Sequence, residues 1–144
     1  MSTPHIDQPA FRKALKKILP SSWVYTNSFY TLAKGTDAGF YRLVPRLVVK
    51  VENEAEMALL VGLCYRYGVA CTLKAGGTSL SGQTVTESLL IETGSGFSGY
   101  EISEDGKYAS FQCGVPGGLA NGRLAPYGRK LGPSPASVNS ARIG

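Results

Sequence analysis

The sequence is poor in the residue types on which several classes of enzyme depend. Its 144 residues include a single histidine, His5, so neither a Ser-His-Asp triad nor a histidine-rich metal site can be assembled from it. The three cysteines, at positions 64, 71 and 113, are odd in number and lack CxxC spacing, which argues against a disulfide framework and a zinc site. We expect reduced, buried cysteines, no metal, and neither a typical hydrolase nor a metalloenzyme.

Long apolar runs and strong charge are also missing. No stretch approaches the roughly 18 apolar residues that a membrane-spanning helix needs, and the chain does not open with a basic region followed by an apolar core. We therefore expect a cytoplasmic protein with no membrane span. The net charge of +5 favours anionic partners only mildly, and no motif indicates nucleic-acid binding.

The composition nevertheless suffices for one packed core, because 43% of the residues are hydrophobic. Residues 1–45 are expected to hold one amphipathic helix and then an irregular, aromatic-rich segment. Phe11, Leu15 and Ile18 recur at helical spacing before Pro20 ends the run. From residue 21 to 45 the rings and turn formers show no clean period.

Residues 46–96 predict a β-α-β unit. Residues 47–51 are apolar at nearly every position, which is typical of a strand covered on both faces. Asn53 is placed to cap a helix, with Glu56 completing a capping box and Gly68 in the place of a left-handed C-cap. Two further strands, paired in parallel, are predicted at residues 69–73 and 89–92.

Residues 97–144 predict a different kind of sheet. Asp105-Gly106 separates two strand-like segments, as in an antiparallel hairpin. A helix from Pro116 to Tyr127 is also expected, although three glycines lower its propensity. The predicted fold class is therefore α+β, with a β-α-β subdomain containing a partly parallel sheet and the first strands of an antiparallel second subdomain.

Residues 75–83, which we call the glycine loop, directly follow a predicted strand. Three glycines let the backbone approach a ligand closely, and successive N–H groups in such turns converge on an anion. The hydroxyls of Thr78, Ser79 and Ser81 add neutral donors. The pattern predicts a cradle for a diphosphate, and an ordinary glycine-rich connection is the alternative.

Two known phosphate motifs nearly match this region. Residues 77–84 have P-loop spacing, but Gln83 occupies the lysine position, so ATP hydrolysis is not expected; a P-loop-like nucleotide-binding module remains an alternative. Gly94, Gly96 and Gly99 fit the dinucleotide motif, yet a strand follows where that motif requires a helix. We interpret the second match as accidental.

The order of these segments resembles the N-terminal part of the FAD-binding domain (type 2, PCMH-like) of the vanillyl-alcohol oxidase and p-cresol methylhydroxylase superfamily. The resemblance spans residues 36–144 and rests on the β-α-β unit, the glycine loop, Gly114-Val115, residues 131–137 and Ile143-Gly144. Within the superfamily, the chain looks most like the bacterial FAD-linked D-lactate dehydrogenases and glycolate oxidases.

The resemblance implies two groups of FAD contacts. The glycine loop would wrap the diphosphate, and a second segment would line the flavin and its ribityl chain. No histidine lies near the loop, so the flavin is expected to be noncovalent. The implied cofactor-binding residues are Ala75, Gly76, Gly77, Thr78, Ser79, Leu80, Ser81, Gly82 and Gln83 in the loop, and Gly132, Pro133, Ala136, Ser137, Ile143 and Gly144 in the second segment.

The activity implied for the parent protein is the oxidation of a 2-hydroxy acid such as D-lactate or glycolate, with FAD accepting the hydride. The chain ends at Gly144, inside an Ile-Gly-Gly signature, so we expect a fragment or the product of an interrupted gene. Such a piece would be inactive alone, hold no catalytic residue and bind FAD weakly or not at all. The alternative is a noncatalytic remnant whose unfinished sheet edge is completed by a second copy.

Overall fold

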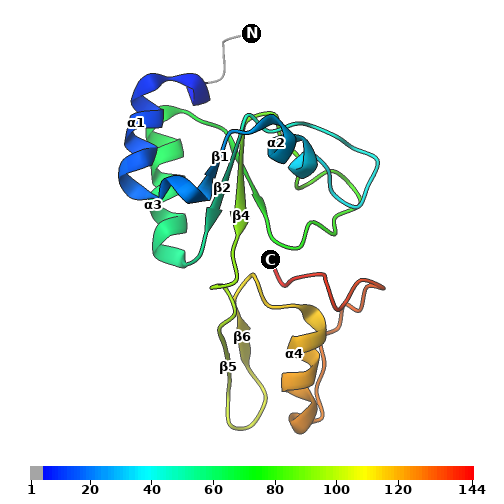
Figure 1. Ribbon diagram of the computed structural model, residues 1–144. Helices are drawn as coiled ribbons and strands as arrows, with labels where there is room; N and C mark the ends of the chain where they lie inside the picture. Colours follow the sequence, from blue (N-terminus) through cyan, green and yellow to red (C-terminus); the bar gives the residue numbers. More distant parts are fainter. Residues whose placement is uncertain (1–4) are drawn as a thin grey trace.

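The computed structural model describes residues 5–144; residues 1–4, which begin the predicted segment 1–45, lie outside this description. The chain forms two parts stacked end to end, a helix-covered sheet and a smaller unit of one hairpin and one helix (Figure 1). They are joined by the chain that leaves β4 (Leu89–Thr93), and the C-terminus lies between them (Figure 1). Among residues 5–144, no helix has the length and apolar character needed to cross a membrane.

The larger part is built on a four-stranded sheet. Its spatial order is β1 (Val24–Tyr25), β2 (Leu47–Val51), β4 and β3 (Cys71–Lys74). Strands β2 and β3 both run parallel to β4, and β1 pairs antiparallel with β2. The predicted partly parallel sheet is thus confirmed, with β4 inserted between the two strands that precede it in sequence. The side chains at the centre of β2 and β4 are fully buried, as the apolar runs indicate.

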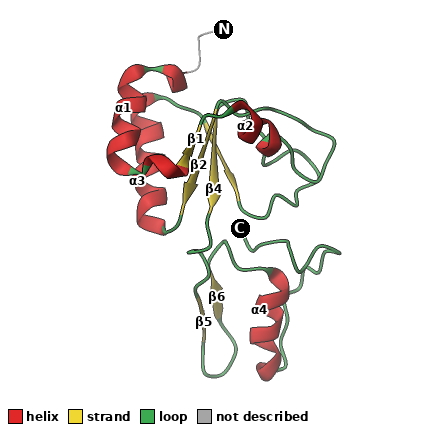
Figure 2. Ribbon diagram, viewed as in Figure 1, coloured by secondary structure: helices red, strands yellow, loops and turns green. Residues whose placement is uncertain are grey.

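Helices α1 (Pro9–Ile18) and α3 (Glu54–Tyr67) cover one face of this sheet (Figure 2). The ring of Phe11 meets that of Tyr67 edge-on, with centroids 5.9 Å apart. The Asn53 side chain accepts the N–H of Glu56 at 3.0 Å, which confirms the predicted cap. The Glu56 carboxylate reaches back to the N–H of Glu52 at 2.8 Å, one residue earlier than a capping box places it.

The expectation of an irregular segment at residues 21–45 is wrong for part of its length. This stretch contains β1 and a helix, α2 (Ser28–Lys34). The Asn27 side chain caps α2 by accepting the N–H groups of Phe29 at 2.8 Å and Tyr30 at 3.3 Å. A seven-residue helix is too short to show a hydrophobic period, so only the cap could have revealed it.

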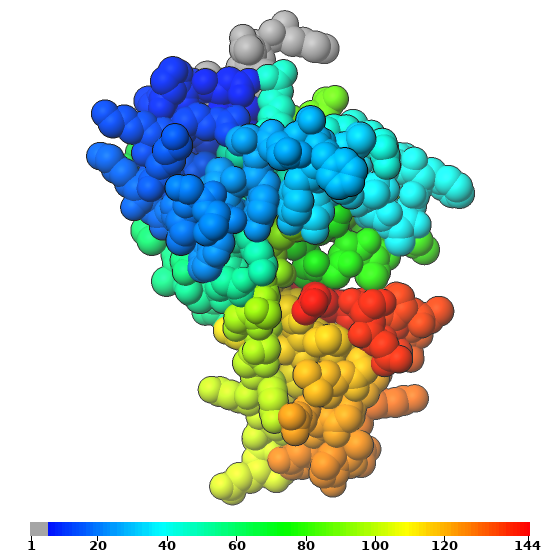
Figure 3. Space-filling view, in the orientation of Figure 1, coloured from blue at the N-terminus to red at the C-terminus, as the bar shows by residue number. Residues whose placement is uncertain are grey.

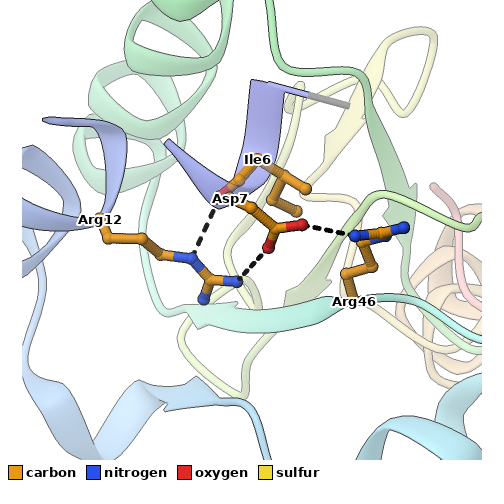
Figure 4. Close-up of polar contacts among 4 residues, drawn as sticks. All are labelled: Ile6, Asp7, Arg12 and Arg46. Carbon is orange, nitrogen blue, oxygen red and sulfur yellow. Dashed lines mark hydrogen bonds and ion pairs between the residues drawn. The ribbon is translucent and has the colours of Figure 1, made fainter. Parts of the chain in front are cut away.

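Asp7 fastens the start of α1 to the start of β2 (Figure 4). One carboxylate oxygen lies 3.4 Å from the Arg12 guanidinium, and the other pairs with Arg46. The Arg12 Nε also donates to the carbonyl oxygen of Ile6 at 3.1 Å. These charged groups are largely exposed, so each ion pair is worth only about 0–1 kcal/mol.

Glu52 fastens the end of β2 to the chain that leaves β4. Its carboxylate accepts the N–H of Gly96 at 2.8 Å and lies 2.8 Å from the Lys50 ammonium. A Cβ added to Gly96 would lie 2.0 Å from the Glu52 carbonyl oxygen, so only glycine fits there. Two glycines of the apparent dinucleotide motif, Gly94 and Gly96, therefore serve the junction between the two parts.

The smaller part holds the predicted hairpin, β5 (Tyr100–Ile102) and β6 (Ala109–Phe111), which turns at Gly106 with φ +65°. The expected helix is confirmed as α4 (Gly117–Leu124), extended by a 3-10 turn to Tyr127. The final residues then run back along the start of α4. The hydrogen bonds there join Gly118 N–H to Val138 O, Gly117 N–H to Ala141 O, Ile143 N–H to Val115 O and Gly144 N–H to Cys113 O.

All three cysteines are free thiols. Cys64 is buried as expected, but Cys71 and Cys113 are only half-buried, so the expectation of burial is wrong for those two. Cys71 starts β3, an edge strand of the sheet, which leaves one of its sides uncovered.

Candidate functional site

The glycine loop leaves the carboxyl end of β3 and twice adopts the left-handed backbone region. Gly77 has φ +64° and Gly82 has φ +77°, values that residues with a Cβ rarely adopt. A Cβ on Gly77 would lie 2.7 Å from Cε of Lys74, and a Cβ on Gly82 would lie 3.1 Å from the Tyr41 ring. Both positions therefore favour glycine for its conformation, and their neighbours leave little space for a Cβ.

A run of backbone N–H groups in this loop has no partner in the part of the chain that the structure describes. Among the described residues 5–144, the N–H groups of residues 76–80 donate no hydrogen bond. Those of Ser81 and Gly82 are already used, donating to Ser79 Oγ at 3.3 Å and to the Asp37 carboxylate at 3.1 Å. The open donors therefore cover a shorter stretch than residues 75–83.

The side chains of the loop add further polar groups. The Ser79 hydroxyl donates to the amide oxygen of Gln83, so it is turned onto the loop itself. Thr84 Oγ1 is buried without a hydrogen-bond partner among the described residues. Buried polar atoms normally have partners, so open N–H groups in the loop and an unpaired hydroxyl at the residue that follows it are features of a site for an anionic ligand.

Beneath the loop, Lys74 is buried and bound to α2. Its ammonium donates to the carbonyl oxygens of Lys34 at 3.2 Å and Thr36 at 2.5 Å, and burial lowers the pKa of Lys74. The Lys34 ammonium in turn lies 2.8 Å from the Glu92 carboxylate. The burial of Tyr30 and the same carboxylate raise the pKa of the Tyr30 hydroxyl, which donates to Glu92 at 3.2 Å. Sequence reasoning did not anticipate this cluster.

The structure gives no support to a P-loop at residues 77–84. A P-loop leads into a helix whose N-terminus faces the phosphates, whereas this loop leads through turns to β4. The ammonium group nearest to it in sequence, that of Lys74, is held by α2.

The second predicted segment meets the glycine loop in space. A Cβ on Gly76 would lie 2.8 Å from the Ser140 carbonyl oxygen, so the two backbones touch. The space-filling view shows the red C-terminal residues against the green stretch that contains the loop (Figure 3). Arg142 fixes this approach by donating to the carbonyl oxygen of Gly114.

An apolar hollow of about 310 Å³ lies between the start of α4 and the second segment. Of the residues predicted to line a flavin, Pro133 and Ile143 border it, together with Gly117 and Leu131. The others play different parts in the structure. The Ser137 carbonyl oxygen accepts two backbone N–H groups in a turn, Gly144 packs against Cys113, and Gly132 and Ala136 do not border the hollow.

The fold and this site together have the features expected of a domain that binds an anionic cofactor. A partly parallel sheet presents a glycine loop with open N–H groups, and a second segment reaches the loop from the smaller part. The sequence profile of the family described as "FAD binding domain" matches residues 45–144. The chain therefore belongs to this FAD-binding family, and FAD is the cofactor of the family.

Among curated proteins, the chain is similar to D-2-hydroxyglutarate dehydrogenases. It is 23% identical to the one from Pseudomonas putida, over 98% of this chain and 14% of that protein. It is 26% identical to the one from Pantoea ananatis, over 78% of this chain and 11% of that protein. The chain thus spans about one seventh or less of these relatives.

Among solved structures, the chain is similar to an alkyldihydroxyacetonephosphate synthase, with a TM-score of 0.77, 19% identity and coverage of 100% of this chain and 30% of that one. It is also similar to p-cresol methylhydroxylase, with a TM-score of 0.73, 16% identity and coverage of 94% and 29%. These likenesses confirm the fold expected from the sequence, the PCMH-type FAD-binding fold.

Proposed function

We propose that the glycine loop binds the diphosphate of FAD through the free N–H groups of residues 76–80. This is the observation that carries the proposal, because N–H groups without internal partners gain most from a ligand that accepts hydrogen bonds. Thr84, which directly follows the loop, has a buried hydroxyl without a partner among the described residues and would also gain from a ligand that bonds to it. These donors are neutral backbone groups, so the loop could hold a diphosphate without a lysine side chain in contact with it.

We further propose that the second segment faces the flavin half of the cofactor and that the FAD is held noncovalently. The contact between Gly76 and Ser140 supports this arrangement, since it brings the second segment to the diphosphate site. The apolar hollow at Pro133 and Ile143 suits an uncharged ring system better than a phosphate. The remaining predicted contacts, at Gly132, Ala136, Ser137 and Gly144, stay predictions.

We infer that the whole protein is an FAD-dependent oxidoreductase acting on a 2-hydroxy acid. The names of the curated relatives favour D-2-hydroxyglutarate over the D-lactate or glycolate expected from sequence. FAD, when bound, supplies the acceptor for the two electrons that leave the substrate. We assign no catalytic residue to this chain, whose described part would hold the cofactor.

The cytoplasmic location, the division at residues 45/46 and 96/97, and self-association through a sheet edge remain predictions. Self-association can be tested by light scattering.

Titration of the 144-residue chain with FAD, followed by flavin fluorescence, tests the proposed loop. We expect weak but saturable binding, which is lost in Gly77→Val because a β-branched side chain at φ +64° displaces the loop backbone. Gly128→Val is the matched control, since Gly128 also has a positive φ, of +65°, but has open space around it. It should reproduce the backbone strain and keep the FAD affinity.

Two results would contradict the proposal. One is an unaltered affinity in Gly77→Val. The other is no saturation of the wild type up to about 1 mM FAD, which corresponds to a binding free energy weaker than about −4 kcal/mol. A parallel titration with ATP separates the alternative, because tighter binding of ATP than of FAD would favour a nucleoside triphosphate module.

A further inference from the structure

We propose that Asp37 is a positioning residue of the FAD diphosphate site, holding the glycine loop in the shape that leaves the N–H groups of residues 76–80 free. Asp37 lies in the connection between α2 and β2, outside the stretch that matches the family profile. The inference rests on the proposed function of the loop and adds to it a residue that does not itself contact the cofactor.

The two carboxylate oxygens of Asp37 bind two different segments. Oδ1 accepts the N–H of Gly39 at 2.8 Å, which forms a tight turn within the connection itself. Oδ2 accepts the N–H of Gly82 at 3.1 Å, 45 residues further along the chain. One side chain therefore holds the connection against the far end of the glycine loop.

Residues 36–41, which we call the strap, reinforce this link at three more points. The N–H of Ala38 donates to the carbonyl oxygen of Ser79 at 3.0 Å. Gly39 lies so close that a Cβ there would be 2.6 Å from the Leu80 carbonyl oxygen, and the Tyr41 ring packs on Gly82. The strap thus engages carbonyl groups of the loop and a single loop N–H, and uses none of the N–H groups of residues 76–80.

The strap is itself anchored at its other end. The buried Lys74 ammonium donates to the carbonyl oxygen of Thr36, directly before Asp37, and the Lys74 side chain also supports Gly77 from below. Lys74 and Asp37 therefore hold the loop near its start and its end. With both points fixed, the intervening N–H groups are ordered before a ligand arrives, which lowers the entropy that binding must otherwise overcome.

The direction in which FAD affinity changes when the Asp37 charge is removed tests the role of this residue. A carboxylate beside a site for a diphosphate repels the ligand, so a carboxylate that merely happened to lie there would weaken binding. Removing its charge would then raise the affinity. If Asp37 positions the loop, removing its second acceptor lowers the affinity in spite of the lost repulsion.

The experiment compares Asp37→Asn with Asp7→Asn in the 144-residue chain. The control makes the same change of charge at Asp7, whose ion pairs with Arg12 and Arg46 do not involve the glycine loop. Affinities are measured for FAD, for ADP, which carries the diphosphate, and for adenosine, which does not. We expect Asp37→Asn to lose at least tenfold in FAD and ADP affinity with adenosine binding unchanged, and Asp7→Asn to bind all three as the wild type does.

Equal or tighter FAD binding by Asp37→Asn, in a wild type that binds FAD, overturns the inference about Asp37 and leaves the proposed function standing. Absence of FAD binding by the wild type overturns both. If Asp37→Asn does not fold, Asp37→Ser keeps one acceptor for the Gly39 N–H and likewise removes the acceptor for the Gly82 N–H. Amide hydrogen exchange of the wild type provides a test without variants: without FAD, the Gly82 N–H should already be protected and those of residues 76–80 should not, and fast exchange at Gly82 overturns the inference.

Discussion

The contact of Gly96 with Glu52 should make Gly96→Ala one of the most damaging single-methyl additions in the chain. The added Cβ would lie 2.0 Å from the Glu52 carbonyl oxygen, so the backbone must move. Forcing one extra carbon into a filled space costs about 1–3 kcal/mol. The same movement weakens the N–H donated to the Glu52 carboxylate, and a hydrogen bond to a charged group is worth about 1.5–3 kcal/mol. Both effects come from the same backbone movement and are not fully additive. We therefore expect the free energy of unfolding to fall by about 3 kcal/mol.

The assay is urea unfolding followed by the fluorescence of Trp23, the single tryptophan, which packs against the core. Gly122→Ala is the matched control, since Gly122 is exposed in α4 with nothing within 4 Å of its Cβ position. The control should gain up to about 1 kcal/mol from helix propensity. If Gly96→Ala lowered the free energy of unfolding by less than about 0.5 kcal/mol, the size of an ordinary surface change, the reasoning about the junction would be refuted.

Two further predictions concern titrating groups. Hydrogen bonds from Lys50 and from the Gly96 N–H lower the pKa of Glu52 from its ordinary value of 4.5, so its contribution to stability is complete above that value and is lost as the pH falls through the lowered pKa. The destabilisation caused by Glu52→Gln in urea unfolding should therefore be largest near neutral pH and shrink as the pH falls below 4.5; a pH-independent difference would contradict this. The interaction between the two thiols lowers the pKa of Cys71, whereas the same interaction and burial raise the pKa of Cys64. Iodoacetamide should thus alkylate Cys71 before Cys64 in peptide mapping, at a rate that rises with pH as the Cys71 thiol ionises, and equal labelling of both would count against the pairing.

The elements that the sequence predicted well are those with local signals of their own. Strand β2 has the predicted bounds, because its apolar run is continuous and its ends are marked. Helix α3 begins after Asn53 and ends at Gly68, where φ is +64°, as the two caps indicate. Helix α2 was missed because its apolar positions are too few to form a pattern. The insertion of β4 between β2 and β3 also has no local signal, since strand order is decided by long-range packing.

The candidate site divides in the same way. Positive φ at Gly77 and Gly82 follows from residue type and turn chemistry, so a loop able to bind an anion could be predicted. Which N–H groups stay open could not, because that depends on Asp37, which is distant in sequence. Nothing around Asp37 distinguishes it from an ordinary turn residue, and its second hydrogen bond exists only once the sheet has formed.

The closeness of Gly76 to Ser140 has a consequence for the order in which the protein matures on the ribosome. The sheet and its two covering helices are complete once residue 93 has been made and has left the exit tunnel. The wall that Ser140 and Arg142 form against Gly76 does not yet exist at that stage. A nascent chain would therefore have a folded sheet well before Ser140 and Arg142 reach Gly76, so this side of the proposed diphosphate site would form only after the sheet is in place.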